Sequence, residues 1–181
     1  MEVGRQERRL PAQDGERKAM TKAAVVTISD SAAHGKRTDR SGPATVEVLR
    51  QHGFDVTQQR IVVDDRSEIE QTLIQLSEQV QLIVTTGGTG ISERDVTPEA
   101  TRAVCSKLIE GIPEKMRADG LRSTDFAILS RGVCGIRKGA LILNLPGSPA
   151  GAVDSLQSVV EILPHALEIL AGHTAHENDE P

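Results

Sequence analysis

Apolar, β-branched runs alternate with amphipathic segments along the first half of this chain. The runs at 23–29, 54–63 and 82–86 predict strands, and the second is polar in its middle, as is typical near the edge of a sheet. Residues 41–51 and 67–80 lie between these runs and predict helices. This order predicts two βαβ units, and therefore a parallel sheet with right-handed crossovers and helices on both faces.

The second half of the chain continues the pattern with shorter elements. We expect a helix from Thr97 towards Gly111, a short helix near Pro113, and short strands at 127–130 and 140–145. A last helix is expected to begin at Pro149, with Ser148 as its cap, and to carry apolar residues on one face as far as Leu170. Pro164 lies inside this segment and should kink it.

The composition fits a globular protein and excludes several classes of function. Phe54 and Phe126 are the only aromatic residues and the net charge is −5, so we expect no nucleic-acid partner. No apolar run approaches the roughly 20 residues that span a bilayer, so we expect no membrane partner. Cys105 and Cys134 form no Cys-x-x-Cys pair, which indicates reduced thiols and a cytoplasmic location.

The domain boundaries follow from where the apolar pattern begins and ends. Residues 22–172 carry the pattern and predict a single α/β domain. Residues 1–21 mix acidic and basic side chains without apolar periodicity, and we expect a disordered N-terminal extension. Residues 173–181 are polar and are expected to form a disordered tail.

A glycine-rich loop at 86–90 is the strongest candidate for a binding site. It joins a predicted buried strand to a helix expected to begin at Thr97. Glycines let backbone N–H groups approach an anion without a Cβ in the way. Arg94 and Asp95 place opposite charges beside the loop, and a carboxylate there can hold a metal. A tight turn that uses glycine only for its geometry is the alternative, and the neighbouring charges favour the anion site.

Three further polar segments follow predicted strands. They are Ser29–Asp30, Asp64–Asp65 and Pro146–Ser148. In open α/β sheets, ligands bind beyond the carboxyl ends of the strands, so these segments and the glycine loop should converge on one rim. Asp65 is the exception, since it is expected to cap a helix or to lie in solvent.

Several separated motifs occur together in this chain in a recognisable order. They are Ile28-Ser29-Asp30, Asp39-Arg40-Ser41-Gly42-Pro43, Asp64-Asp65, Thr86-Gly87-Gly88-Thr89-Gly90, Arg94-Asp95-Val96-Thr97-Pro98-Glu99-Ala100, Ile128-Leu129-Ser130-Arg131, Gly135-Ile136-Arg137 and Leu145-Pro146-Gly147. With these motifs the chain resembles, from about Lys22 to Gly172, the MogA/MoaB-type molybdenum cofactor biosynthesis proteins, the molybdopterin adenylyltransferases.

The resemblance implies a fold, an activity and partners. The fold would be a three-layer α/β/α arrangement with a mostly parallel, mixed sheet. The activity would be Mg²⁺-dependent transfer of AMP from ATP to molybdopterin, with release of pyrophosphate. A homotrimer and hand-over of the product to a molybdenum-insertion protein would follow.

The resemblance also assigns roles to particular residues. The two acidic positions of the family fall on Asp64 and Asp95, which are the expected catalytic residues and metal ligands. The expected substrate-binding residues are Ser29, Asp30, Arg40, Ser41, Thr86, Gly87, Gly88, Thr89, Gly90, Ser130, Lys138, Pro146, Gly147 and Ser148. Arg131 and Arg137 are further candidates for neutralising phosphate charge.

Two alternatives to an active enzyme stay open at this point. The first is a catalytically inactive carrier or scaffold that only binds molybdopterin. The serine at position 148 resembles the MoaB branch of the family, which includes inactive members. The second is an unrelated phosphate binder on a similar sheet. The intact Arg94–Glu99 stretch, which the inactive members lose, favours the enzyme.

Overall fold

The computed structural model describes residues 20–172 of the 181-residue chain. The predictions of a disordered extension and a disordered tail fall almost entirely on residues outside this range. Thr21 is described, and its carbonyl accepts a hydrogen bond from the N–H of Asp55 at 3.0 Å.

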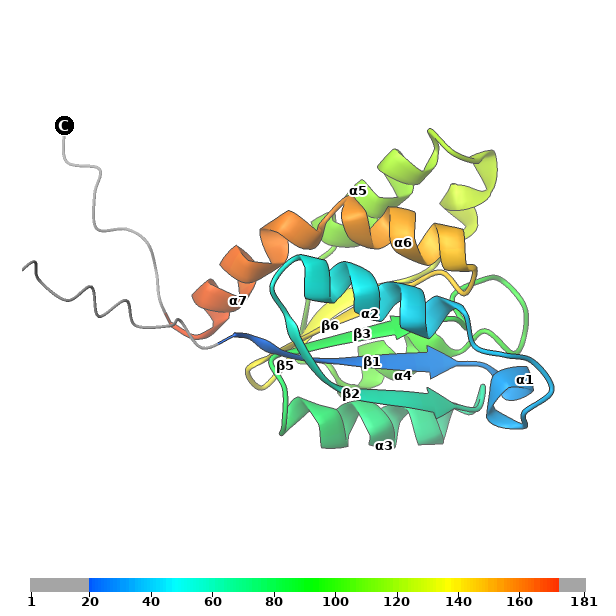
Figure 1. Cartoon of the computed structure of the whole chain (residues 1–181), viewed down its shortest axis with the longest axis horizontal. Coiled ribbons are helices and arrows are strands. Elements are labelled where there is room, and N and C mark those ends of the chain that lie inside the picture. The colour runs from blue at the N-terminus through cyan, green and yellow to red at the C-terminus, as the bar shows by residue number, and fades with distance from the viewer. Residues whose placement is uncertain (1–19, 173–181) are drawn as a thin grey trace, which may run out of the picture.

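Strands and helices alternate along the described chain, as Figure 1 shows. In chain order they are β1 (Lys22–Ile28), α1 (Asp30–Ala33), α2 (Ser41–Gln51), β2 (Asp55–Val62), α3 (Arg66–Ser77), β3 (Leu82–Thr86), α4 (Thr97–Val104), β4 (Lys107–Leu108), α5 (Gly111–Gly120), the 3₁₀ helix η1 (Asp125–Leu129), β5 (Cys134–Arg137), β6 (Ala140–Leu145), α6 (Pro149–Gln157), the 3₁₀ helix η2 (Val160–Ile162) and α7 (Leu163–Leu170).

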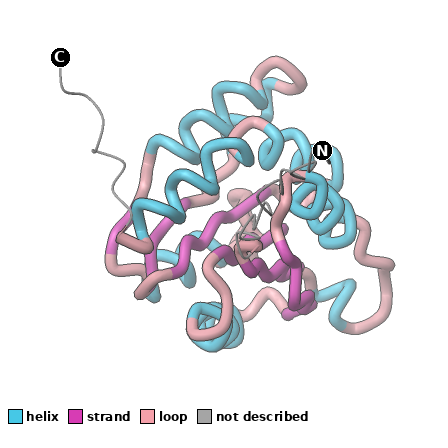
Figure 2. The backbone as a smooth tube through the Cα atoms, turned by 60° about the vertical axis from the view of Figure 1, so that its left-hand side comes forward, coloured by secondary structure: helices cyan, strands magenta, loops and turns pink. Residues whose placement is uncertain are grey.

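The strands form one mixed sheet in the order β2-β1-β3-β6-β5-β4. Strands β2, β1, β3 and β6 run parallel to one another, whereas β5 is antiparallel to β6 and β4 is antiparallel to β5. Strand β2 lies at the edge, as its polar middle predicted. The predicted three-layer fold with a mostly parallel sheet is confirmed, and Figure 2 shows helices on both sides of the strands.

Each face of the sheet has its own apolar core, because neighbouring residues of a strand point to opposite faces. Val25 of β1 packs in the core that includes residues of α2, α5, α6 and α7. Val26, the next residue, packs in the core that includes residues of α3 and α4. Both valines are buried. The strands need apolar side chains on both faces, which explains why the runs at β1, β3 and β6 are continuous rather than alternating.

The structure corrects the prediction of a strand at 127–130. This segment belongs to η1, where the Thr124 side chain accepts a hydrogen bond from the N–H of Phe126 and starts a 3₁₀ turn. Apolar composition alone does not distinguish a short strand from such a turn.

Helix boundaries differ from the predictions where the chain changes direction. Helix α4 ends at Val104 rather than near Gly111, since residues 107–108 pair with β5 as a short edge strand. The single kinked helix expected from Pro149 to Leu170 is three elements, α6, η2 and α7. Pro164 lies in the first turn of α7, where the missing N–H costs nothing.

Candidate functional site

The carboxyl ends of β1, β2, β3 and β6 meet at one rim, which holds a polar hollow of about 390 Å³. Predicted substrate-binding and catalytic residues line it, namely Ser29, Arg40, Ser41, Asp64, Thr86, Gly87, Gly88, Gly147 and Ser148. The structure thus brings together side chains from four separate strand ends, as the strand-end argument predicted.

A second hollow, of about 380 Å³, lies on the other side of the segment at 147–148. Thr89, Gly90 and Ser130 line it together with Gly147 and Ser148. Its remaining wall comes from α5, η1 and α6 and is rich in apolar side chains, including Met116, Phe126 and Leu129. Gly147 and Ser148 therefore separate a polar hollow from a largely apolar one.

The glycine loop holds a shape that other residues would strain. Gly87 and Gly88 have φ angles of +105° and +61°, in the left-handed region that glycine favours. A Cβ on Gly87 would lie 2.2 Å from the carbonyl oxygen of Ile28. The Thr97 hydroxyl donates to the Gly87 carbonyl at 2.9 Å, and the Thr97 N–H donates to the Gly88 carbonyl at 3.1 Å. The start of α4 therefore fixes the loop.

Two N–H groups of this loop are already used inside the protein. The N–H of Gly87 donates to the Leu145 carbonyl at 3.2 Å. The backbone of Gly90 donates to the Asp95 carboxylate. The loop can therefore present the N–H groups of Gly88 and Thr89 to an anion, which is a narrower set than the sequence suggested.

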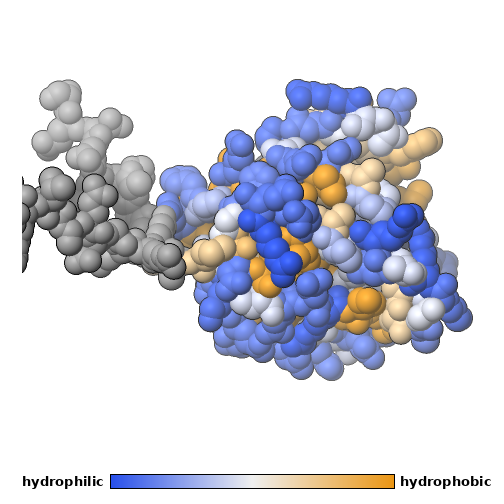
Figure 3. All heavy atoms as spheres, in the orientation of Figure 1, coloured by the Kyte–Doolittle hydropathy of each residue, from blue (hydrophilic) through white to orange (hydrophobic). Residues whose placement is uncertain are grey.

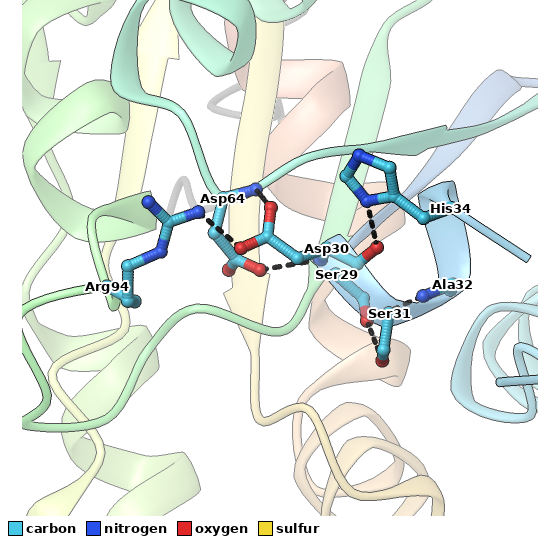
Figure 4. A network of polar contacts seen from close by, with 7 residues as sticks. All are labelled: Ser29, Asp30, Ser31, Ala32, His34, Asp64 and Arg94. Carbon is cyan, nitrogen blue, oxygen red and sulfur yellow. Dashed lines mark hydrogen bonds and ion pairs between the residues drawn. The ribbon is translucent and has the colours of Figure 1, made fainter. Parts of the chain in front are cut away.

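Asp64, after β2, and Asp30, after β1, form reciprocal hydrogen bonds between backbone and carboxylate (Figure 4). The N–H of Asp30 donates to Asp64 Oδ2 at 2.8 Å, and the N–H of Asp64 donates to Asp30 Oδ1 at 3.0 Å. Arg94 forms an ion pair with the Asp30 carboxylate. This arrangement orients Asp64 while its other oxygen, Oδ1, lies 3.3 Å from where a Gly88 Cβ would be.

The two carboxyls of this pair have opposite pKa shifts. The hydrogen bond from Arg94 lowers the pKa of Asp30 below its ordinary value. Burial raises the pKa of Asp64, and the negative charges of Asp30 and Asp95 act in the same direction. Asp64 is therefore a carboxylate whose negative charge the protein itself does not fully compensate.

Asp95, beside Gly90 of the glycine loop, is the second of the two carboxylates expected to hold the metal. Its Oδ2 accepts a hydrogen bond from the N–H of Ser92 at 2.9 Å. Burial acts to raise its pKa, but the hydrogen bonds from Ser92 and Gly90 outweigh burial, and the net pKa is lowered. The carboxylate of Asp95 is thus ionised and held against the glycine loop.

Arg131 links this loop to the neighbouring chain segments. Its Nε donates to the Gly90 carbonyl at 2.6 Å, its Nη2 donates to the Asp95 carbonyl at 2.6 Å, and its guanidinium pairs with Glu99. The Arg131 N–H donates to the Thr89 carbonyl at 2.9 Å. These bonds make Arg131 a structural clamp, whereas the sequence suggested a phosphate ligand.

Replacing Arg131 by Lys should loosen this clamp, because one ammonium cannot reproduce a planar guanidinium fork. We expect a loss of about 1–2 kcal/mol, discounted for the partial exposure of the pair, and a melting temperature lower by roughly 2–8 °C. Calorimetry beside Arg122→Lys, which changes a guanidinium that is mostly exposed, checks this expectation. Equal melting curves for the two variants would contradict the clamp.

Lys138 does not reach the rim. It lies in the turn between β5 and β6, at the opposite end of the sheet, and pairs with Glu78 at the end of α3. The expected substrate-binding role of Lys138 does not fit this position, because β6 begins just after Lys138 and its carboxyl-end features lie at 146–148. Arg137 is also turned away from the hollow residues, since its Nη1 donates to the Val104 carbonyl at 3.0 Å.

Asp39 is a residue of the polar hollow that the sequence reasoning did not single out. Its carboxylate accepts hydrogen bonds from the Thr27 hydroxyl at 2.7 Å and from the N–H of Gly42 at 3.0 Å. It therefore joins β1 to the first turn of α2 and helps to place Arg40 and Ser41. An acidic residue three positions before a helical N–H is a capping signal, and that signal identifies it.

Fold and rim together define a class of α/β protein in which a glycine-rich loop beyond the carboxyl ends of parallel strands forms the ligand site. The family described as "Probable molybdopterin binding domain" matches residues 24–165. The chain belongs to this family, and the resemblance seen in its motifs is confirmed.

Individual relatives agree with this assignment. A molybdopterin adenylyltransferase of Helicobacter pylori strain J99 is 40% identical over 160 residues, which cover 86% of this chain and 91% of that protein. The molybdopterin adenylyltransferase of Escherichia coli K12 is 44% identical over 140 residues, covering 75% and 71%. The crystal structure of the molybdopterin biosynthesis enzyme MoaB from Thermus thermophilus superposes with a TM-score of 0.80 at 44% identity, covering 84% of this chain and 98% of that one.

Proposed function

We propose that this protein transfers the adenylyl group of ATP to molybdopterin in molybdenum cofactor biosynthesis. The observation that carries the proposal is the pair of hollows that share Gly147 and Ser148 as a wall. Both hollows border the glycine loop; one is polar and contains Asp64, and the other is largely apolar. Such a pair suits a reaction between a triphosphate, in the polar hollow, and a phosphate that carries an organic ring, in the largely apolar one. The names of the curated relatives support the same activity.

The reaction needs alignment and charge neutralisation, because both reactants are anions. An oxygen of the molybdopterin phosphate would attack the α-phosphorus of ATP, and the bond from that phosphorus to the bridging oxygen would break to release pyrophosphate. The N–H groups of Gly88 and Thr89 would hold the phosphate at which the new bond forms. The start of α4, just beyond the loop, contributes a partial positive charge.

The rim suits Mg²⁺. This ion takes carboxylate and phosphate oxygens and keeps several waters. Burial raises the pKa of Asp64, and the negative charges of Asp30 and Asp95 add to the effect, so a cation held by Asp64 and Asp95 would relieve this repulsion. Between residues 20 and 172 there is no group of three or more His, Cys, Asp or Glu placed to hold a metal. Asp64 and Asp95 would therefore hold Mg²⁺ together with the phosphates, and the ion would supply neutralisation of phosphate charge.

The direct test is to mix the protein with Mg-ATP and molybdopterin and to measure pyrophosphate and adenylylated molybdopterin. We expect the two products in equal amounts, and neither when molybdopterin is omitted. Binding of molybdopterin without pyrophosphate would instead indicate a carrier and would overturn the proposed transfer.

We also infer a homotrimer, since the resemblance implies one, and hand-over of the product to a molybdenum-insertion protein. Figure 3 shows separate apolar patches among hydrophilic side chains on one face of the molecule, which is compatible with subunit contacts. Light scattering coupled to size exclusion should give about three times the mass of the chain. A monomer at micromolar concentration would contradict this prediction.

No helix of the described residues is long and apolar enough to cross a membrane.

A further inference from the structure

Phe126 has an unusual position for the aromatic residue of a chain that has only two. The other, Phe54, is buried in the core, whereas the Phe126 side chain is 77% exposed on η1. Phe126 lines the largely apolar hollow, together with Met116 and Leu129. A large apolar ring left in solvent costs free energy, and at the mouth of a hollow it offers a flat surface to a ligand.

The backbone around Phe126 is held firmly in place. Thr124 caps η1 through the Phe126 N–H, and a Cβ on Gly120 would lie 2.8 Å from that of Ala127, so α5 packs closely on η1. Beyond η1, the Arg131 N–H donates to the Thr89 carbonyl of the glycine loop at 2.9 Å. The backbone that carries Phe126 therefore keeps a defined place relative to the loop that would bind phosphate.

Asp154 contributes a carboxylate to the same hollow from α6. Ser148, at the start of this helix, caps it by accepting from the N–H of Gly151. The pyrimidine edge of a pterin presents an amino group and a ring N–H side by side, and a carboxylate accepts both in a bidentate manner. The hollow thus offers an aromatic face and an acidic edge, the two features that recognise a pterin.

We propose that Phe126 and Asp154 recognise the pterin of molybdopterin, Phe126 by stacking on the ring and Asp154 by accepting from its amino and N–H edge. This inference rests on the proposed function, because it assigns the largely apolar hollow to molybdopterin and the polar hollow to ATP. Both residues act as specificity determinants, and neither takes part in the phosphoryl chemistry.

Fluorescence titration with 6-carboxypterin tests the aromatic face. The chain has no Trp or Tyr, so the pterin signal is free of protein emission. Phe126→Leu keeps apolar volume but removes the ring, and the dissociation constant should rise about tenfold, a typical effect of losing one aromatic stacking partner. Phe126→Tyr keeps an aromatic ring and should keep the wild-type dissociation constant. Ile128→Ala is the matched control, since Ile128 is exposed on the same η1 but does not line this hollow.

Asp154→Asn tests the acidic edge, because an amide oxygen accepts without the charge. We expect the dissociation constant for 6-carboxypterin to rise about tenfold, as for loss of a charge-assisted contact. The dissociation constant for Mg-ATP should not change in either variant. Glu161→Gln, which alters an exposed carboxylate on η2, is the matched control.

The outcomes separate this inference from the proposed function. An unchanged pterin affinity in Phe126→Leu and Asp154→Asn, with adenylyl transfer intact in the wild type, would overturn the inference alone. Failure of the wild type to bind 6-carboxypterin would also overturn it. A Phe126→Leu protein with a smaller mass by light scattering would show that a second copy covers the ring, which contradicts pterin stacking. Absence of transfer by the wild type would contradict the proposed function instead.

Discussion

Asp64→Asn is expected to lower the rate of adenylyl transfer about a hundredfold or more, the usual loss when one electrostatic contact to a reacting phosphoryl group is removed. The amide oxygen can still accept from the N–H of Asp30, so the side chain keeps its place. What the substitution removes is the negative charge that would hold Mg²⁺ against the phosphates.

The same substitution should leave the fold intact. Burial raises the folded-state pKa of Asp64, so above that pKa the ionised carboxylate opposes folding rather than supporting it. Removing the charge should therefore leave the melting temperature unchanged or raise it slightly at neutral pH. Asp95→Asn should differ, since the pKa of Asp95 is lowered and its charge stabilises the loop. That variant should lose both rate and some stability.

Asp65→Asn is the matched control for these carboxylates. Asp65 is exposed and caps α3 by accepting from the N–H of Glu68 at 3.0 Å, a bond that asparagine also makes. Transfer rate and melting temperature should both stay at the wild-type values. Near-normal turnover of Asp64→Asn at saturating Mg-ATP would remove the metal role from Asp64, and a collapsed melting curve would show a structural one.

Gly88→Ala is expected to weaken nucleotide binding at least tenfold, roughly the effect of losing one charge-assisted hydrogen bond. Gly88 has a φ of +61°, and its new Cβ would lie 2.4 Å from the Thr97 hydroxyl and 3.3 Å from Asp64 Oδ1. The loop must shift, because Thr97 is buried and its hydroxyl bonds to the Gly87 carbonyl. That shift moves the N–H groups of Gly88 and Thr89 away from the phosphate.

The fold should survive the Gly88 substitution. A non-glycine residue in the left-handed region costs about 1–2 kcal/mol, less than the roughly 5–15 kcal/mol by which domains are stable. Gly139→Ala controls for the loss of a glycine, since a Cβ there meets no atom within 4 Å. Calorimetric titration with Mg-ATP gives the dissociation constants of Gly88→Ala and of the Gly139→Ala control. An unchanged value for Gly88→Ala would mean that the loop is only a turn.

Much of the fold could be predicted because local pattern and global packing agree in it. The continuous apolar runs at β1, β3 and β6 are buried on both faces, and that pattern reads directly from the sequence. The segment at 127–130 is apolar but partly exposed, so its pattern carried no such information. The short strand β4 forms only because β5 lies beside it, and its two exposed residues give no local signal.

The site could be predicted to the level of the rim but not to the level of side-chain roles. Strand ends and glycines predicted that Asp64 and the loop share one rim, and they line the same hollow there, because parallel strands share one carboxyl edge. Whether Arg131 binds a ligand or the protein's own carbonyls depends on where η1 turns, which composition does not reveal. Lys138 lies at the opposite end of the sheet for a different reason: it sits in the hairpin turn that leads from β5 into the start of β6.

The proposed site is best tested by a crystal structure with molybdopterin, Mg²⁺ and α,β-methylene-ATP, which cannot be cleaved at the reacting bond. We expect the nucleotide phosphates in the polar hollow at the N–H groups of Gly88 and Thr89, with Mg²⁺ held by Asp64 and Asp95. We expect the pterin in the largely apolar hollow, across the wall formed by Gly147 and Ser148. Phosphates bound elsewhere, or a metal away from both carboxylates, would contradict the proposed site.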